Sequence, residues 1–404
     1  MIEAEQVKVK MDQKGLQVES ANKNFKFKLG GRIHADASFH DGDPYLEDGE
    51  EVEPEDGTEI RRARMRFEGV FFKDWLFRTE ADFADDNVRM KDVFFSYLGS
   101  EFVTLTVGQQ KQNFSRELQE SSNDMMFTER SLMNILNAPI VDRAIGLDFE
   151  HFSNNFTAKL GIYGDSLTPP TGDSGEEGWG ISSRVIFLPI NEKIKLIHLG
   201  IAGNYRKPDD NGEVAKAKKL KLVYETTNMS NLEVIDKGVD NVNDIKMLGL
   251  EAAGMYGPFS MGAEYTRSWI DCGASCDGDT SKSNIELDGW YAEAAWTITG
   301  ESRKYQYGNF RYLEPSKPFA PGTGGWGAYE LAIRYSGANL NDGDFIGGKI
   351  SNITVALNWY INSNFRFLAN YMHVLDTENA ALTKQASGDI DDLDVYMLRG
   401  QVAY

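Results

Sequence analysis

Arginine residues recur at every second position near residue 62. Arg62, Arg64 and Arg66 alternate with Ala63 and Met65. Successive side chains of a β-strand point to opposite faces, so this spacing places the three guanidinium groups in a row on one face. A guanidinium group binds phosphate or carboxylate oxygens through two parallel hydrogen bonds. The row therefore predicts a surface that attracts oxyanions.

The next segment repeats this two-faced pattern with mixed charge. Arg78, Glu80 and Asp82 alternate with apolar and small residues. Burying such charges in a protein core would be very costly, whereas a water-filled lumen solvates them. The two carboxylates could lower anion affinity or pair with the arginines, and pairing is the favoured role.

No cluster of residues indicates catalysis. A hydrolase in this setting would need a nucleophile or activated water beside a histidine and a carboxylate, and no G-x-S-x-G motif is present. The sequence therefore argues against an enzyme. The five histidines are His34, His40, His151, His198 and His373.

The two cysteines lie four positions apart in a polar segment. Cys272 and Cys276 have no further cysteine or nearby histidine that would complete a zinc site. A disulfide at a loop tip in an oxidising compartment is the expected state. We expect neither a metal nor a cofactor.

The acidic residues are concentrated in one stretch. The formal charge of −20 argues against nucleic acid as a partner, because a phosphate backbone requires a basic surface. Ten of the 62 acidic residues lie between Asp41 and Glu59, which reads as one exposed loop too polar to form a strand.

The charged rows must be carried by strands, and the whole chain of 404 residues reads as one domain built from sixteen of them. No run of 18 apolar residues is present, so a bilayer could be crossed only by a closed β-barrel. The expected strands lie near 25–38, 60–72, 75–84, 91–98, 101–110, 142–151, 155–163, 178–187, 194–206, 245–256, 258–267, 286–299, 327–337, 350–361, 364–375 and 394–404.

Connection lengths support a transmembrane barrel in a bacterial outer membrane. Tight links alternate with long polar ones, as periplasmic turns alternate with external loops. The link 300–326 should be a turn, and the pattern gives no reason for its length. Residues 1–24 are expected as a periplasmic segment that includes the start of the first strand, after removal of a signal peptide. A soluble β-sandwich is the alternative fold.

Several blocks resemble the phosphate-selective porin O and P family along nearly the whole chain. These are FKFKLGGRIHAD at 25–36, RRARMRFEGVFFKDWLFRTEADF at 61–83, GWYAEAAWTITGE at 289–301, GAYELAIRYS at 327–336 and LNWYINSNFRFLANYMHV at 357–374. The resemblance implies a homotrimer of sixteen-stranded barrels, each with a pore that the third loop, 111–141, constricts.

The resemblance also implies which residues would guide anions. Arg32 corresponds to an arginine of the family's basic ladder, and Arg61 with Arg62 corresponds to the arginines at the constriction. Two consecutive residues can both face the pore only where a strand is irregular. In the fifth loop the family's arginines are replaced by lysines, which keep the charge but lose the bidentate geometry. These are Lys216, Lys218, Lys219 and Lys221, and a solvated basic run is the other interpretation.

The third loop departs from the family pattern. Leu118 stands where the family has a lysine, and Arg116 is the nearest cation. Asp92 corresponds to an acidic partner of the site, although Lys91 could instead align there. These departures leave the fold prediction intact and place phosphate specificity in question.

The predicted function is passive, anion-selective diffusion of phosphate, polyphosphate or another oxyanion. A general or cation-preferring porin is the main alternative, and an adhesin or scaffold is supported only by the acidic loop and by 207–244. An acidic loop at the mouth would repel anions over about 8 Å at physiological salt. On the rim it could instead bridge lipopolysaccharide through divalent cations.

Overall fold

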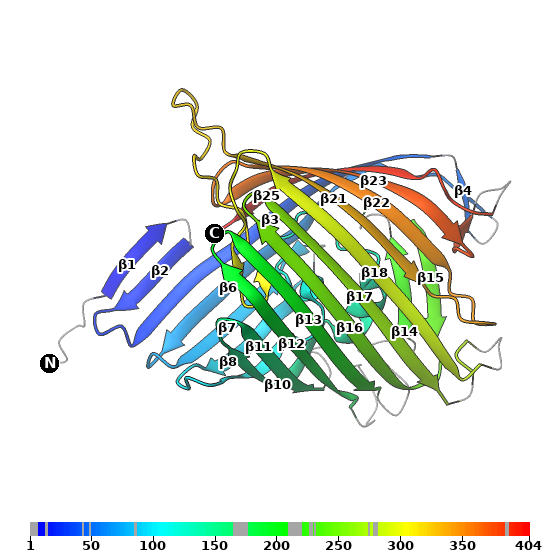
Figure 1. The fold of residues 1–404 in the computed structure, drawn as a ribbon, viewed down its shortest axis with the longest axis horizontal. Helices are drawn as coiled ribbons and strands as arrows, with labels where there is room; N and C mark the ends of the chain where they lie inside the picture. Colours follow the sequence, from blue (N-terminus) through cyan, green and yellow to red (C-terminus); the bar gives the residue numbers. More distant parts are fainter. Residues whose placement is uncertain are drawn as a thin grey trace.

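Sixteen antiparallel strands form a closed barrel, because β25 pairs with β3 from Ala403↔Arg32 to Asp394↔Asp41. The computed structural model describes residues 7–12, 15–42, 44–47, 50–84, 87–164, 177–208, 220–225, 229, 232–273, 275–277, 282–383 and 388–404. Figure 1 shows the strands strongly tilted around the barrel. All sixteen predicted strands are present, so the barrel prediction is confirmed.

The barrel strands are β3 (Phe25–Asp41), β6 (Gly57–Phe71), β7 (Trp75–Asp82), β8 (Arg89–Tyr97), β9 (Thr104–Lys111), β10 (Arg143–Phe152), β11 (Phe156–Tyr163), β12 (Trp179–Glu192), β13 (Lys195–Lys207), β16 (Val242–Tyr256), β17 (Phe259–Cys272), β18 (Asn284–Thr297), β21 (Ala328–Asn339), β22 (Lys349–Tyr360), β23 (Phe365–Glu378) and β25 (Asp394–Ala403). The short links, the start of β3 and the end of β25 lie at one end, which is the periplasmic end in outer-membrane barrels.

The wall strands have an apolar outer face, and many of their inward-facing residues are polar. In β13, Ile197, Leu199 and Ile201 are exposed, whereas His198 and Arg206 are buried. Exposed apolar side chains on a barrel wall face lipid, and the alternate residues face the lumen. Among the described residues no helix is both long and apolar enough to cross a membrane.

Several short elements were not predicted. At the N-terminus, β1 (Val7–Asp12) and β2 (Gly15–Ser20) form a hairpin that pairs with the start of β3 and projects past the barrel wall in Figure 1. The acidic segment contains β4 (Tyr45–Glu47) and β5 (Glu50–Val52), which form a small sheet with β24 (Leu382–Thr383). The expectation that this segment is too polar for strands was wrong, because Tyr45 is fully buried and Val52 packs against the core.

Part of the barrel interior is an apolar core. The helix α2 (Asn134–Val141) lies near the hairpin of β14 (Leu220–Glu225) and β15 (Glu233–Val239). Both pack in one apolar cluster with inward-facing wall residues such as Ile245, Met247 and Leu287. This apolar cluster therefore fills part of the space that the wall encloses.

The predicted disulfide joins Cys272 at the end of β17 to Cys276, with the Cα atoms 5.4 Å apart. The backbone of Cys276 accepts a hydrogen bond from the Asp240 amide at 2.7 Å and donates one to the Lys282 carbonyl at 3.0 Å. The disulfide therefore fixes the turn that follows β15.

Replacing both cysteines by serine should loosen this turn and leave the barrel intact. A cross-link that closes so short a loop contributes about 2 kcal/mol. We expect the Asp240 amide to exchange hydrogen at least about tenfold faster, with no change at Ile270, whose strand ladder does not depend on the disulfide. Unchanged exchange at Asp240 would show that the turn is held by other contacts.

Candidate functional site

A cavity of about 1150 Å³ lies between the wall from β3 to β11 and the segment 112–142 that links β9 to β10. Its lining carries thirteen basic and eight acidic side chains, so it is net positive in a chain of charge −20. The basic residues are Arg32, Arg61, Arg62, Arg64, Arg66, Arg78, Arg89, Lys91, Lys111, Arg130, Arg143, Lys159 and Arg311. The acidic ones are Glu80, Asp82, Asp92, Asp124, Glu129, Asp142, Asp148 and Glu150.

Two β-bulges bring consecutive residues to the cavity. The β3–β6 register changes from His34↔Arg62 to Ala35↔Ile60, which leaves Arg61 without a partner on β3. Arg61 and Arg62 consequently both line the cavity, through the strand irregularity that their spacing requires. A second register change, between β7 and β8, lets both Lys91 and Asp92 line it, so either alignment of this pair places a charged group in the lumen.

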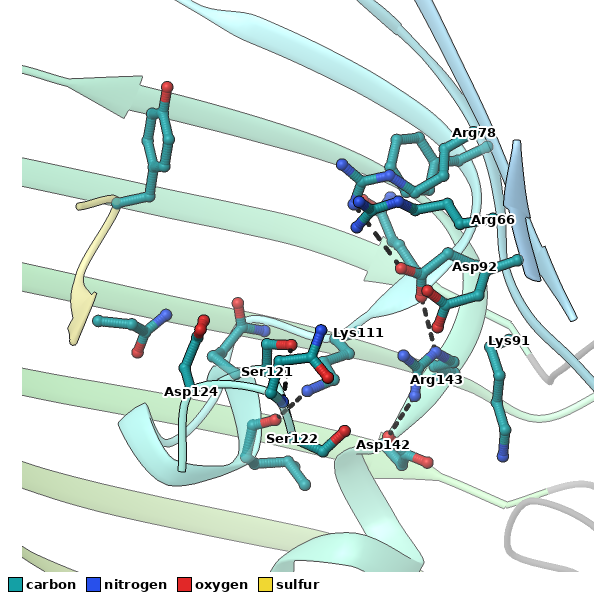
Figure 2. Close-up of a pocket in the computed structure, with 18 of the residues that line it drawn as sticks. Arg66, Arg78, Lys91, Asp92, Lys111, Ser121, Ser122, Asp124, Asp142 and Arg143 are labelled. Carbon is teal, nitrogen blue, oxygen red and sulfur yellow. Dashed lines mark hydrogen bonds and ion pairs between the residues drawn. The ribbon is translucent and has the colours of Figure 1, made fainter. Parts of the chain in front are cut away.

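Some of the lining arginines are neutralised by wall carboxylates. Arg64 contacts Asp82 at 2.7 Å and Glu80 at 3.2 Å. Asp92 accepts a hydrogen bond from Arg143 at 2.7 Å, as Figure 2 shows. Ion pairing was the favoured role of Glu80 and Asp82, and the geometry agrees. These pairs add little net charge to the pathway.

Three other cations of the cavity are paired weakly or, among the described residues, not at all. Arg66 and Lys91 form no ion pair with any residue that the structure describes, and the Nε atom of Arg66 is buried without a hydrogen-bond partner. Arg62 approaches Glu129 only to 3.9 Å, and its Nη1 atom lacks a hydrogen-bond acceptor within the described part of the chain. At these three residues an anion would meet positive charge that is at most weakly paired.

The segment 112–142 is held against the inner wall by many polar contacts. It contains α1 (Arg116–Gln119) and α2. Arg32 donates to the Ser122 hydroxyl at 2.9 Å, and Arg366 donates to the Met125 carbonyl at 2.8 Å. Arg399 also donates to the carbonyl of Thr128. The segment therefore lies inside the barrel and narrows the space beside the β6 arginines.

Glu129 in this segment balances the arginines nearest the mouth. Its carboxylate accepts hydrogen bonds from Arg61 at 3.0 Å and from Arg399 at 3.0 Å. Burial alone would raise the pKa of Glu129, but the guanidinium groups of Arg61, Arg62 and Arg399 hold the pKa well below its usual value. Glu129 is therefore charged at neutral pH.

Two further cations of the cavity bind backbone carbonyl groups. Lys111 Nζ lies 2.6 Å from the Leu118 carbonyl oxygen, and both Lys111 and Arg130 donate to the Glu120 carbonyl. A cation is thus present next to Leu118, although it comes from the end of β9. Lys111 therefore lies close to the position where the family resemblance implies a lysine.

The structure does not place Arg116 in this cavity. Its buried side chain donates to Glu293 at 2.6 Å and to the Tyr291 hydroxyl at 2.5 Å, and its amide donates to Glu264 at 2.8 Å. Arg116 therefore anchors the third loop to β17 and β18. The sequence could not reveal these partners, which lie roughly 150 to 180 positions further along the chain.

The predicted lysine run is only partly described. Lys216, Lys218 and Lys219 lie outside the described residues. Lys221 on β14 is exposed and lies 3.6 Å from Glu233 and 3.3 Å from Asp236, and it does not line the cavity.

The long link after β18 also turns into the barrel. It carries β19 (Tyr305–Gln306) and β20 (Asn309–Phe310). Arg303 pairs with Glu330 at 2.6 Å, and the Tyr312 amide donates to Asp124 of the third loop at 3.0 Å. These contacts explain why the link 300–326 is longer than a turn. The link also brings Tyr307 and Arg311 to the cavity.

Comparison with known proteins identifies the family. The family model described as phosphate-selective porin O and P matches residues 27–404. The chain belongs to this family. Porin O of Pseudomonas aeruginosa is 26% identical to this chain, in an alignment that covers 96% of this chain and 91% of Porin O.

Solved structures support the same fold. An anion-selective porin from Comamonas acidovorans has a TM-score of 0.55 at 14% identity, covering 94% of this chain and 100% of that one. The trimer form of OmpT from Vibrio cholerae has a TM-score of 0.52 at 11% identity, covering 94% and 99%. The protein is thus an outer-membrane porin, and family and fold indicate a channel rather than an enzyme.

Sequence reasoning missed several lining cations. Lys111 ends β9 and Arg143 begins β10, so both flank the third loop. Their position beside an infolded loop could have predicted that they line the cavity. Arg130 and Arg311 lie in irregular segments, where no periodic pattern indicates which way a side chain points.

Proposed function

We propose that this porin carries small oxyanions, phosphate or polyphosphate among them, by passive anion-selective diffusion. The main support is a set of three cations: Arg66 and Lys91, which are unpaired among the described residues, and the weakly paired Arg62, in a cavity whose other arginines are largely neutralised. The family description and the anion-selective relative agree with this proposal.

The spacing of the β6 arginines suits stepwise movement. Alternate residues on a strand lie about 7 Å apart, so an anion leaving Arg62 reaches Arg66 after two such steps. An oxyanion that sheds part of its water gains charge-assisted hydrogen bonds from guanidinium groups. Arg64 between them is paired with Glu80 and Asp82, which keeps binding along the row from becoming too strong for release.

Phosphate should therefore block the chloride current in single-channel recordings. We expect half-block at about millimolar phosphate, which corresponds to roughly 4 kcal/mol of binding. Gluconate added at the same ionic strength is the control for screening. A chloride current that phosphate reduces no more than gluconate does would contradict oxyanion binding.

The carboxylates of the lining leave a general or cation-preferring porin as the second candidate. Eight acidic groups share the cavity with the cations. If acidic side chains from the 41–59 segment reach the mouth, they would lower the local anion concentration. Such a pore would show no phosphate block.

We further propose that the porin is a homotrimer in the outer membrane. The relative solved in a trimer form supports this assembly. The exposed carboxylates of the acidic segment, such as Glu53 and Glu55, suit contact with lipopolysaccharide through divalent cations.

A further inference from the structure

The short-turn end of the cavity is lined by apolar side chains, in contrast to the charged region nearer the mouth. Leu76 is the second residue of β7, Leu98 follows the last residue of β8, and Phe152 ends β10. Tyr307, from the infolded link, completes this lining. An inorganic ion gains nothing from such a surface, because apolar groups cannot replace its lost water.

Aromatic rings of the cavity are covered by cations. The Arg78 guanidinium lies over the Phe94 ring at 5.3 Å, and Lys159 Nζ lies over Phe152 at 5.3 Å. The rings of Phe152 and Tyr307 contact each other edge to face, with centroids 5.2 Å apart. A guanidinium group stacked on a ring can stack a second flat group on its other side.

These rings are distinct from the aromatic belt that faces lipid. Phe95 directly follows Phe94, is 49% exposed, and lies beside Trp75 on the outer wall. Phe94 lines the cavity instead, because successive residues of β8 point to opposite faces. Phe94 therefore places an apolar ring, partly covered by Arg78, inside the cavity.

An unpaired cation lies next to this aromatic surface. Arg66 on β6 and Arg78 on β7 are near neighbours, because Arg66 pairs in register with Glu80 and Glu68 pairs with Arg78. Figure 2 shows their side chains extending side by side into the cavity. Arg78 is neutralised by Glu68 at 2.5 Å, whereas Arg66 has no ion-pair partner among the described residues.

We propose that the cavity binds organic anions that carry a flat apolar group, such as aryl phosphates and aryl carboxylates. The anionic head binds Arg66, and the ring stacks against Arg78 and Phe94. Phe152 and Tyr307 provide a second apolar contact toward the short-turn end. This proposal rests on the proposed anion pathway and names its preferred solutes.

Block of the chloride current by phenylphosphate and methylphosphate tests the proposal. Both are phosphate monoesters and doubly charged at pH 8, so they differ mainly in the apolar group. We expect half-block by phenylphosphate at a concentration about three- to tenfold lower than by methylphosphate. Equal half-blocking concentrations in the unmodified porin would overturn the proposal without any variant.

Variants of two consecutive residues locate the ring contact. Phe94→Leu should reduce the preference for phenylphosphate to within about twofold, whereas Phe95→Leu, on the lipid-facing side, should leave it unchanged. A preference that survives in both Phe94→Leu and Phe152→Leu would contradict the assigned surface. If methylphosphate and inorganic phosphate also fail to block the chloride current, the anion pathway itself is wrong. If both block it and phenylphosphate blocks at no lower concentration than methylphosphate, only the proposed aryl binding fails.

Discussion

The double variant Arg62→Gln and Arg66→Gln is expected to lose at least about tenfold in its anion-to-cation permeability ratio. Each of these arginines contributes positive charge that no described carboxylate cancels at hydrogen-bond distance. A unit charge at 4 Å from an ion is worth about 1 kcal/mol in a water-like dielectric, or a factor of about five. Two such factors account for the expected change, and the reversal potential in a salt gradient measures it.

Arg267→Gln is the control for removing an arginine charge outside the cavity. Arg267 lies on β17 with its side chain exposed and paired with Glu286, and it does not line the cavity. The same chemical change there should leave the permeability ratio within about twofold of the unmodified value. A double variant that stays as anion-selective as the control would show that other groups set the selectivity.

The second large effect is expected from Arg116→Ala, which should at least about double the single-channel conductance and increase current noise. Arg116 is surrounded by Glu120, Glu264 and Glu293 and is almost completely buried. Removing one member of a buried ion-pair network costs about 3–5 kcal/mol, because the remaining charges lose their partner. The third loop should then leave β17 and β18 and widen the pore.

Arg116→Lys separates the role of charge from that of geometry. A lysine keeps the positive charge, but its single nitrogen cannot replace both Nη1, which contacts Glu120 at 3.5 Å, and Nη2, which contacts Glu293 at 2.6 Å. We expect an intermediate conductance. Retained heat-modifiable mobility in SDS gels would show that the barrel still folds, and an unchanged conductance in a folded Arg116→Ala porin would mean that the third loop does not limit the flow.

The barrel could be predicted from the sequence because lipid and water impose a period of two on every wall strand. In β6 this period alone identifies Arg62, Arg64 and Arg66 as inward-facing residues. Short elements such as β4 and β19 have too few residues to show a period. Such strands form through tertiary contacts, for example the burial of Tyr45 in β4 and of Phe310 in β20, which pairs with β19.

The pattern could not predict which cations are paired. Arg64 and Arg66 are equivalent in the sequence, yet Arg64 lies opposite Asp82 in the β6–β7 register and contacts two carboxylates, whereas Arg66 contacts none among the described residues. Arg116 was assigned to the pathway from its place in the loop, but distant acidic residues bind it instead. The chain positions of charges are visible in the sequence, and their pairing is a property of the folded barrel.

The measurement that tests this account most directly is the reversal potential of the unmodified porin in a tenfold KCl gradient. An ideally anion-selective pore reverses at the chloride equilibrium potential, about 59 mV from zero. The cations of the cavity predict that the reversal potential moves from zero toward the chloride equilibrium potential by more than about half of that value. A reversal potential at zero, or one displaced toward potassium, would contradict the anion pathway.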